Sequence, residues 1–196
     1  MNLPNKLTLS RLVLTVAFLA VLFSEIPHYE TLSLILFCIA SLTDYYDGMI
    51  ARRDKLITNF GILMDPLADK ILICSVFIAF VGLDLMYAWM VVIIVARELA
   101  ITGLRLLAAS QNVVLAAERY GKHKTISQTV AIISVLVLMS YQQWGPAGKT
   151  IFGCSLFGMP WVVWFTELSK WLAVLLTFIS GALYLWRNRG LYLQDI

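Results

Sequence analysis

The sequence predicts an all-α membrane protein with six transmembrane helices, a short N-terminal interfacial helix and both termini in the cytoplasm. Of its 196 residues, 60% are hydrophobic and only 14% are charged, with a mean hydropathy of +0.82. A soluble domain has about a quarter of its residues charged. The apolar runs are long and do not alternate with polar residues, which favours helices over a membrane barrel. No repeat or composition shift divides residues 1–196, so we expect a single domain.

Each apolar segment is predicted to form one span, and the segments between them carry turn and interface signals. Pro4 suits a helix start, so Asn5–Ser10 is predicted to be the interfacial helix. Gln142–Pro160 is glycine-rich and is predicted to be the longest loop, while the tryptophans in Phe157–Glu167 suggest a segment lying flat at the far interface. The predicted spans are Leu9–Ser24, Glu30–Ile50, Phe60–Gly82, Met86–Ala109, Thr125–Tyr141 and Leu168–Trp186.

Basic residues gather in alternate loops, and this pattern predicts the orientation. The intervening loops hold only Lys149 and Lys170. Because cytoplasmic loops carry the excess of lysine and arginine, both termini are predicted to be cytoplasmic. We expect the protein to lie in the inner (plasma) membrane, with any functional site at the cytoplasmic ends of the spans facing the cytoplasm. The residues on the predicted cytoplasmic side are Lys6, Arg11, Arg52, Arg53, Lys55, Arg105, Arg119, Lys122, Lys124, Arg187 and Arg189.

Four carboxylates interrupt this apolar sequence. Asp44 and Asp47 lie near the end of the second predicted span, and Asp65 and Asp69 lie near the start of the third. The spacing within each pair places both carboxylates on one helix face. A charge at the bilayer centre costs roughly 2.5–3.5 kcal/mol, and four carboxylates together would repel one another. An all-oxygen cluster suits two divalent cations, Mg²⁺ or Mn²⁺, and two-metal sites serve phosphoryl transfer.

Small and polar residues surround the aspartates. Gly48, Ala51 and Gly61 lie on the same helices and leave room for a flat ligand to approach the backbone. Arg52 can bind a diphosphate through two parallel hydrogen bonds, and Thr58 adds a hydroxyl donor. The glycines alone would also suit helix packing in a membrane.

Two other classes of function remain open on these residues. A lone membrane aspartate can serve as a proton relay or as the coupling site of an ion-coupled transporter. A transporter predicts inverted repeats and a second polar cluster, and the sequence shows neither. A metal-binding scaffold without enzymatic activity would leave Arg52 and the glycines unexplained.

The segment DYYDGMIARRDKLITNFGILMDPLAD, from Asp44 to Asp69, resembles the signature of the CDP-alcohol phosphotransferases. That signature is D-x-x-D-G-x-x-A-R, eight residues, and then G-x-x-x-D-x-x-x-D. The resemblance extends over essentially the whole chain, since the six predicted spans also fit the family. The matching positions are Asp44, Asp47, Gly48, Ala51, Arg52, Gly61, Asp65 and Asp69.

The resemblance implies a reaction in which an acceptor alcohol attacks the lipid-side phosphorus of a CDP-linked lipid and CMP leaves. It implies that the four aspartates hold two divalent metals and that Asp69 is the general base. It also implies that the CDP-lipid site includes Gly48, Ala51, Arg52, Thr58 and Gly61, and that the enzyme is a homodimer.

Shorter motifs suggest the acceptor. Asn2–Arg11, Ala96–Arg105 and Gly121–Thr125 resemble the phosphatidylglycerophosphate synthases, a branch of this family. The expected substrates are therefore CDP-diacylglycerol and glycerol 3-phosphate, with membrane lipid around the protein and no nucleic acid. Serine, an inositol phosphate or phosphatidylglycerol remain alternative acceptors.

Basic residues near these motifs form a candidate site for the acceptor phosphate, a dianion near neutral pH. Lys122 and Lys124 equally suit ordinary cytoplasmic charge or lipid headgroup contact. Arg97 lies deeper in its span, where an unpaired cation is costly, and either Glu98 or an aspartate could pair with it. The predicted phosphate-binding residues are Arg97, Arg105, Lys122 and Lys124.

Overall fold

The computed structural model describes residues 3–24, 26–54, 59–111 and 120–192. Within these ranges, the side chains of residues 3–8, 44–54, 59–67, 69, 110 and 120–122 are outside the description. Six long helices account for most of the described chain: α1 (Leu3–Leu22), α2 (Tyr29–Asp54), α3 (Asn59–Gly82), α4 (Ala88–Ser110), α5 (Tyr120–Ser140) and α7 (Trp161–Arg187).

Short elements connect α5 to α7 and follow α7. A 3₁₀ turn, η1 (Tyr141–Trp144), leads into α6 (Gly145–Phe152), and α8 (Arg189–Tyr192) follows α7. Between α6 and α7, β1 (Ser155–Leu156) pairs antiparallel with β2 (Met159–Pro160). Both turn residues between these strands, Phe157 and Gly158, have positive φ, as the tight turns of two-residue hairpins require.

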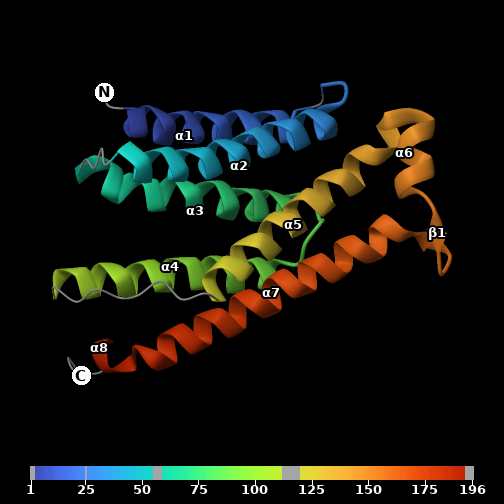
Figure 1. Ribbon diagram of the computed structural model, residues 1–196. Helices are drawn as coiled ribbons and strands as arrows, with labels where there is room; N and C mark the ends of the chain where they lie inside the picture. The colour runs from blue at the N-terminus through green and yellow to red at the C-terminus, as the bar shows by residue number, and fades with distance from the viewer. Residues whose placement is uncertain (1–2, 25, 55–58, 112–119, 193–196) are drawn as a thin grey trace.

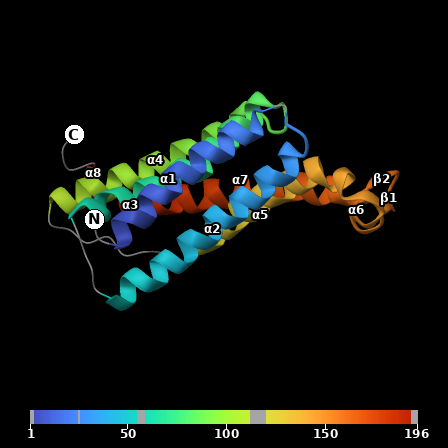
Figure 2. The ribbon, with the colours of Figure 1, turned by 90° about the horizontal axis from the view of Figure 1, so that it is seen from above.

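The long helices run alternately in opposite directions, as Figure 1 shows. The start of α1, the end of α2 and the end of α7 lie at one end of the molecule, which we call the N/C end. Helix α6 and the β1–β2 hairpin lie at the other end (Figures 1 and 2). Elements that are distant in sequence therefore share the N/C end, including the segments of α2 and α3 that carry the aspartates.

Large apolar side chains fill the space between the helices. Phe18, Phe37, Phe77 and Phe80 are fully buried, and they come from α1, α2 and α3. Buried polar pairs hold α5 against α7, where membrane helices commonly use small polar side chains. These pairs are Gln128 Nε2 with Thr177 Oγ1 at 3.0 Å and Ser134 Oγ with Ser169 Oγ at 2.7 Å.

The outer surface of the helices is apolar, as expected of a membrane protein. Helix α7 exposes Trp171, Leu175 and Phe178. Among the described residues, two helical stretches are long and apolar enough to cross a membrane, His123–Phe152 and Trp161–Arg187. The shorter apolar helices are Leu9–Leu22, Tyr29–Thr43 and Lys70–Gly82.

Two predicted interfacial segments are wrong as separate elements. Asn5–Ser10 is not a short helix of its own, because α1 continues from Leu3 to Leu22 and no glycine or proline after Pro4 interrupts it. Phe157–Glu167 does not lie as one flat segment. The chain reverses at Phe157 and Gly158, and α7 begins at Trp161.

The longest predicted loop contains secondary structure, and indole groups fasten it to α7. Trp161 Nε1 donates to the carbonyl of Ile151 at 2.7 Å. Trp164 Nε1 donates to the carbonyl of Leu156 at 3.1 Å. These bonds link α6 and the hairpin to the first turns of α7, which explains why that helix begins earlier than hydropathy predicts.

Candidate functional site

The four aspartates lie at similar distances from the ends of two helices, α2 and α3, and both of these ends belong to the N/C end of the molecule. Asp44 is ten residues before the last residue of α2, and Asp69 is ten residues after the first residue of α3. At about 1.5 Å per residue, both lie about 15 Å from their helix ends. Asp47 and Asp65 lie seven and six residues from the same ends. Each pair thus lies within about 15 Å of its own helix end.

The CDP-lipid residues predicted from the sequence share these helix segments. Gly48, Ala51 and Arg52 belong to α2 and Gly61 belongs to α3, whereas Thr58 lies outside the described residues. The side chains of Arg52 and the four aspartates are also outside the description. Among the side chains that are described, no group of three or more histidine, cysteine, aspartate or glutamate residues could hold a metal. The two-metal site therefore stays a prediction, and its donor set of four carboxylates fits hard divalent cations.

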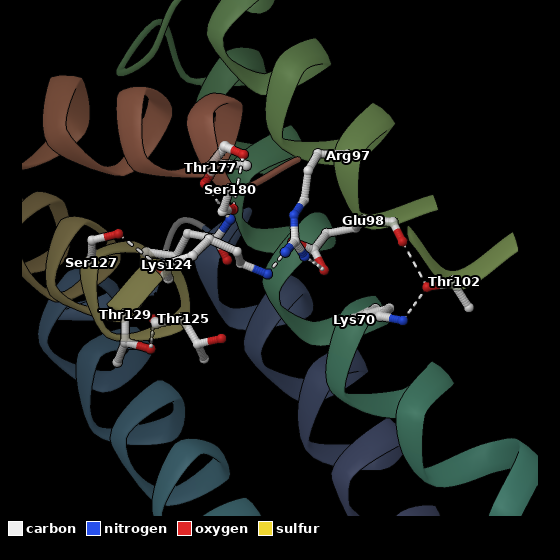
Figure 3. A network of polar contacts seen from close by, with 11 residues as sticks. Lys70, Arg97, Glu98, Thr102, Lys124, Thr125, Ser127, Thr129, Thr177 and Ser180 are labelled. Atoms are coloured by element: carbon white, nitrogen blue, oxygen red, sulfur yellow. Dashed lines mark hydrogen bonds and ion pairs between the residues drawn. The ribbon is translucent and has the colours of Figure 1, made fainter. Parts of the chain in front are cut away.

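A buried carboxylate joins two of the predicted phosphate-binding cations. Glu98 on α4 is 3% exposed, and its Oε1 accepts a hydrogen bond from Nζ of Lys124 on α5. Nη1 of Arg97 lies 3.4 Å from the same oxygen (Figure 3). Of the two kinds of partner predicted for Arg97, Glu98 is in contact with it, whereas the side chains of the four aspartates lie outside the description. Two cations from different helices thus contact one carboxylate oxygen at this point.

A hydrogen-bond chain links this cluster to the aspartate helix α3. Lys70 Nζ donates to Thr102 Oγ1, and Thr102 Oγ1 donates to the main-chain carbonyl of Glu98 at 2.6 Å (Figure 3). Lys70 directly follows Asp69 in α3. The chain therefore ties the turn of α4 that carries Arg97 and Glu98 to the turn of α3 that carries Asp69.

Arg97 packs against α7, and one of its N–H groups is unpaired among the described residues. The guanidinium Nε of Arg97 is buried and has no hydrogen-bond partner in the part of the chain that the structure describes. Its aliphatic stem lies against Gly181 of α7. A cavity of 360 Å³ between α4 and α7 is lined by Arg97 and by apolar side chains such as Val92 and Phe178. This arrangement suits an anionic group, either one that is part of a lipid or one on a soluble molecule that binds next to a lipid.

The structure does not place all four predicted cations together. Arg105 is exposed, its Nε lies 3.4 Å from the hydroxyl of Tyr184, and its guanidinium lies 5.7 Å from the centre of that ring. It follows Arg97 by eight residues, or about 12 Å of helix. The side chain of Lys122 lies outside the description. Arg97 and Lys124 thus form the buried part of the candidate site, and Arg105 lies toward its exposed edge.

Four residues of this site were not predicted as part of it, and sequence signals exist for only some of them. Glu98 appeared only as a partner for Arg97, and Thr102 follows it at the i,i+4 spacing that places both on one helix face. Gly181 and Tyr184 had no local signal. They meet Arg97 and Arg105 from about 80 residues away, so only the packing of α7 on α4 reveals them.

We expect Gly181→Ala to destabilise the protein and Gly103→Ala to leave it unchanged. A Cβ at Gly181 would lie 2.7 Å from Cγ and 3.6 Å from Cβ of Arg97, which are stem atoms with little freedom to move. Such overpacking typically costs about 1–3 kcal/mol. A Cβ at Gly103, on α4 itself, would meet no atom within 4 Å. Thermal unfolding in detergent measures the difference, and equal midpoints for the two variants would contradict the packing.

Comparison with known proteins agrees with these observations. Residues 1–179 match the family described as CDP-alcohol phosphatidyltransferase. A Bacillus subtilis protein named CDP-diacylglycerol–glycerol-3-phosphate 3-phosphatidyltransferase is 39% identical over 95% of both chains. A Rickettsia bellii protein of the same name is 34% identical over 93% of both chains. A Mycobacterium tuberculosis protein named as a probable phosphatidylglycerophosphate synthase is 42% identical over 67% of this chain and 64% of its own. This chain therefore belongs to the CDP-alcohol phosphatidyltransferase family.

Proposed function

We propose that this chain is a CDP-diacylglycerol–glycerol-3-phosphate 3-phosphatidyltransferase, which makes phosphatidylglycerophosphate and CMP in phospholipid biosynthesis. The observation that carries the proposal is the pairing of two features: a complete aspartate signature at similar distances from the ends of α2 and α3, and a buried cation cluster tied to α3 through Thr102. The names of the relatives support the same activity and the same two substrates.

The lipid donor is assigned to the aspartate end of α2 and α3. In this assignment Asp44, Asp47, Asp65 and Asp69 hold two divalent cations, Mg²⁺ or Mn²⁺. Bound there, the cations would neutralise charge on the diphosphate and on the departing CMP. On the same helices, Gly48, Ala51 and Gly61 leave room for the cytidine, while Arg52 and Thr58 donate hydrogen bonds to the nucleotide and diphosphate.

The acceptor is assigned to the cation cluster on α4 and α5. Arg97 and Lys124 hold the phosphate of glycerol 3-phosphate, with Arg105 and Lys122 at the edge. The buried Nε of Arg97 has no acceptor among the described residues, and it supports this role because such a donor is rare unless a ligand or water satisfies it. A dianion between these groups would receive charge-assisted hydrogen bonds, which are among the stronger polar contacts in proteins.

The reaction needs one bond to form and one to break at the lipid-side phosphorus. One of the two free hydroxyls of glycerol 3-phosphate attacks that phosphorus, Asp69 accepts the hydroxyl proton, and the bond to the CMP oxygen breaks. The protein contributes alignment of the hydroxyl and stabilisation of charge, since phosphoryl transfer needs little covalent chemistry from side chains. Substrate tails remain in the bilayer, which explains why the site is built on membrane helices.

The proposed topology has six spans with both termini in the cytoplasm, a single domain, and a homodimer in the inner (plasma) membrane. The arrangement of charge supports this sidedness. Arg187 and Arg189 lie near the end of α7 and in α8, at the N/C end, whereas the opposite end carries Lys149 in α6 and the exposed Asp84. Because positive residues mark the cytoplasmic side, the N/C end and the proposed site face the cytoplasm.

We expect purified protein to release CMP from CDP-diacylglycerol only when glycerol 3-phosphate and Mg²⁺ or Mn²⁺ are both present. Chelation with EDTA should abolish release, and added metal should restore it. The assay compares glycerol 3-phosphate with serine, inositol, inositol phosphate and phosphatidylglycerol as acceptors. Release with another acceptor alone would keep the assignment of the aspartates and refute that of the cation cluster. No release from folded, metal-loaded protein with any acceptor would refute the proposed function.

A further inference from the structure

Glu98 is a buried carboxylate that has no part in the reaction described above. Its side chain is 5% exposed and lies against Lys124 and Arg97, whose side chains are 7% and 13% exposed. Desolvating an ion costs several kcal/mol, and a buried ion pair often contributes little net stability for that reason. A site whose purpose is to bind an anion also loses attraction when it contains a negative charge. Neither the stability of the fold nor electrostatic attraction of the substrate therefore explains why a carboxylate is buried at this position.

The geometry around Glu98 suggests an explanation. One of its carboxylate oxygens, Oε1, contacts both Nζ of Lys124 and Nη1 of Arg97. The two cations come from different helices, α5 and α4, and would repel each other without the oxygen between them (Figure 3). Two cationic groups that contact one oxygen are close enough for a single phosphate to contact both. Glu98 thus holds the cations at the separation that a phosphate needs.

The main chain of Glu98 is fixed as well, relative to the aspartate helix. Its carbonyl accepts the hydrogen bond from Thr102, which in turn accepts from Lys70 of α3, the residue after Asp69. The distance between the phosphate and the attacking hydroxyl of glycerol 3-phosphate is limited by its three carbons. A phosphate displaced by even 1 Å would misplace the hydroxyl, and such errors are costly in rate. Glu98 therefore affects both the spacing of the two cations and the distance between the bound phosphate and Asp69.

We propose that Glu98 is a positioning residue for the acceptor: it holds Lys124 and Arg97 in the arrangement that binds the phosphate of glycerol 3-phosphate. The proposal rests on the proposed function and adds to it a residue that acts through other side chains rather than on substrate. Preorganised cations lose less rotamer freedom on binding, because the long lysine and arginine stems are already ordered.

The test is a double-mutant cycle of Glu98→Gln and Lys124→Gln, with steady-state kinetics for both substrates. We expect Glu98→Gln to raise KM for glycerol 3-phosphate about 10- to 100-fold, the range for losing a hydrogen bond to a charged group. KM for CDP-diacylglycerol should stay within about twofold of wild type, because Glu98 belongs to the acceptor site and a change there should not affect binding at the separate CDP-lipid site. The loss in the double variant should be smaller than the product of the two single losses, because Glu98 acts partly through Lys124 and partly through Arg97.

Two further variants separate positioning from structural support. Glu30→Gln makes the same chemical change at a partly buried glutamate of α2, which accepts a hydrogen bond from Gln143 at the opposite end of the molecule, and it should leave both KM values unchanged. Glu98→Asp keeps the charge and should recover part of the affinity for glycerol 3-phosphate. It also replaces Glu98→Gln in the test if that variant fails to fold.

The outcomes distinguish this proposal from the proposed function. Wild-type protein that releases no CMP with glycerol 3-phosphate overturns both. Active wild-type protein combined with an unchanged acceptor KM in Glu98→Gln and Glu98→Asp overturns only the positioning role. The positioning role is also overturned if kcat, both KM values and the unfolding midpoint all worsen in Glu98→Gln and the loss in the double variant equals the product of the two single losses. That pattern would indicate that Glu98 only supports the structure.

Discussion

Replacing Asp69 with asparagine is expected to lower the rate of CMP release by about 10²- to 10⁴-fold, the usual contribution of a general base. Asparagine has nearly the same shape but carries no charge and cannot accept the hydroxyl proton. Because Asp69 is also assigned as a metal ligand, the assay is repeated over a range of Mg²⁺ concentrations. A loss that persists at saturating metal supports the base, whereas full recovery at high metal restricts Asp69 to metal binding.

Asp84→Asn is the matched control for this variant. Asp84 is exposed between α3 and α4, at the end of α3 away from the N/C end, and has a φ of 57°. Asparagine tolerates this left-handed conformation as well as aspartate does, so the backbone should not change. We expect wild-type activity and stability. An Asp69→Asn variant that is as active as Asp84→Asn would contradict the assignment of the catalytic site.

Replacing Arg105 with alanine is expected to raise KM for glycerol 3-phosphate about 10- to 100-fold, the range for a lost charge-assisted hydrogen bond. The guanidinium of Arg105 rests over Tyr184 and is exposed, so donors remain for a phosphate at the edge of the site. KM for CDP-diacylglycerol should barely change. Steady-state kinetics with each substrate varied in turn measure both values.

Arg189→Ala controls for the loss of a cation near an aromatic ring at the same end of the molecule. The guanidinium of Arg189 lies 4.6 Å from the ring centre of Trp186 and is also exposed. Arg189 is not assigned to either substrate, so its removal should leave both KM values unchanged. Equal effects of Arg105→Ala and Arg189→Ala would indicate a general electrostatic influence and remove Arg105 from the acceptor site.

Much of the fold could be predicted because its signals are local. Long apolar runs identify helices in a bilayer, since every backbone polar group must be satisfied within the segment. The first and last residues of the helices were harder to predict. Hydropathy placed the start of the last span at Leu168, but the apolar and polar residues from Trp161 onward belong to the same helix. Contacts to Ile151 and Leu156 fix that start, and hydropathy does not register such contacts.

The candidate site divides in the same way. The aspartate pairs could be predicted as shared helix faces because their members lie three and four residues apart. The pairing of Glu98 with Lys124 joins residues 26 positions apart, and Gly181 meets Arg97 across an even longer separation. No periodicity relates such residues, so their contact depends on how helices pack.

The sequence by itself determined that the chain forms apolar helices and that α2 and α3 carry the four aspartates as two face-sharing pairs, because helix formation and helix faces depend on neighbouring residues. Only the tertiary structure decided which cations share a carboxylate, that Thr102 links this group to α3, and that Arg105 stands apart at Tyr184. Those contacts join α3, α4, α5 and α7, and their geometry is set by the packing of whole helices rather than by local spacing.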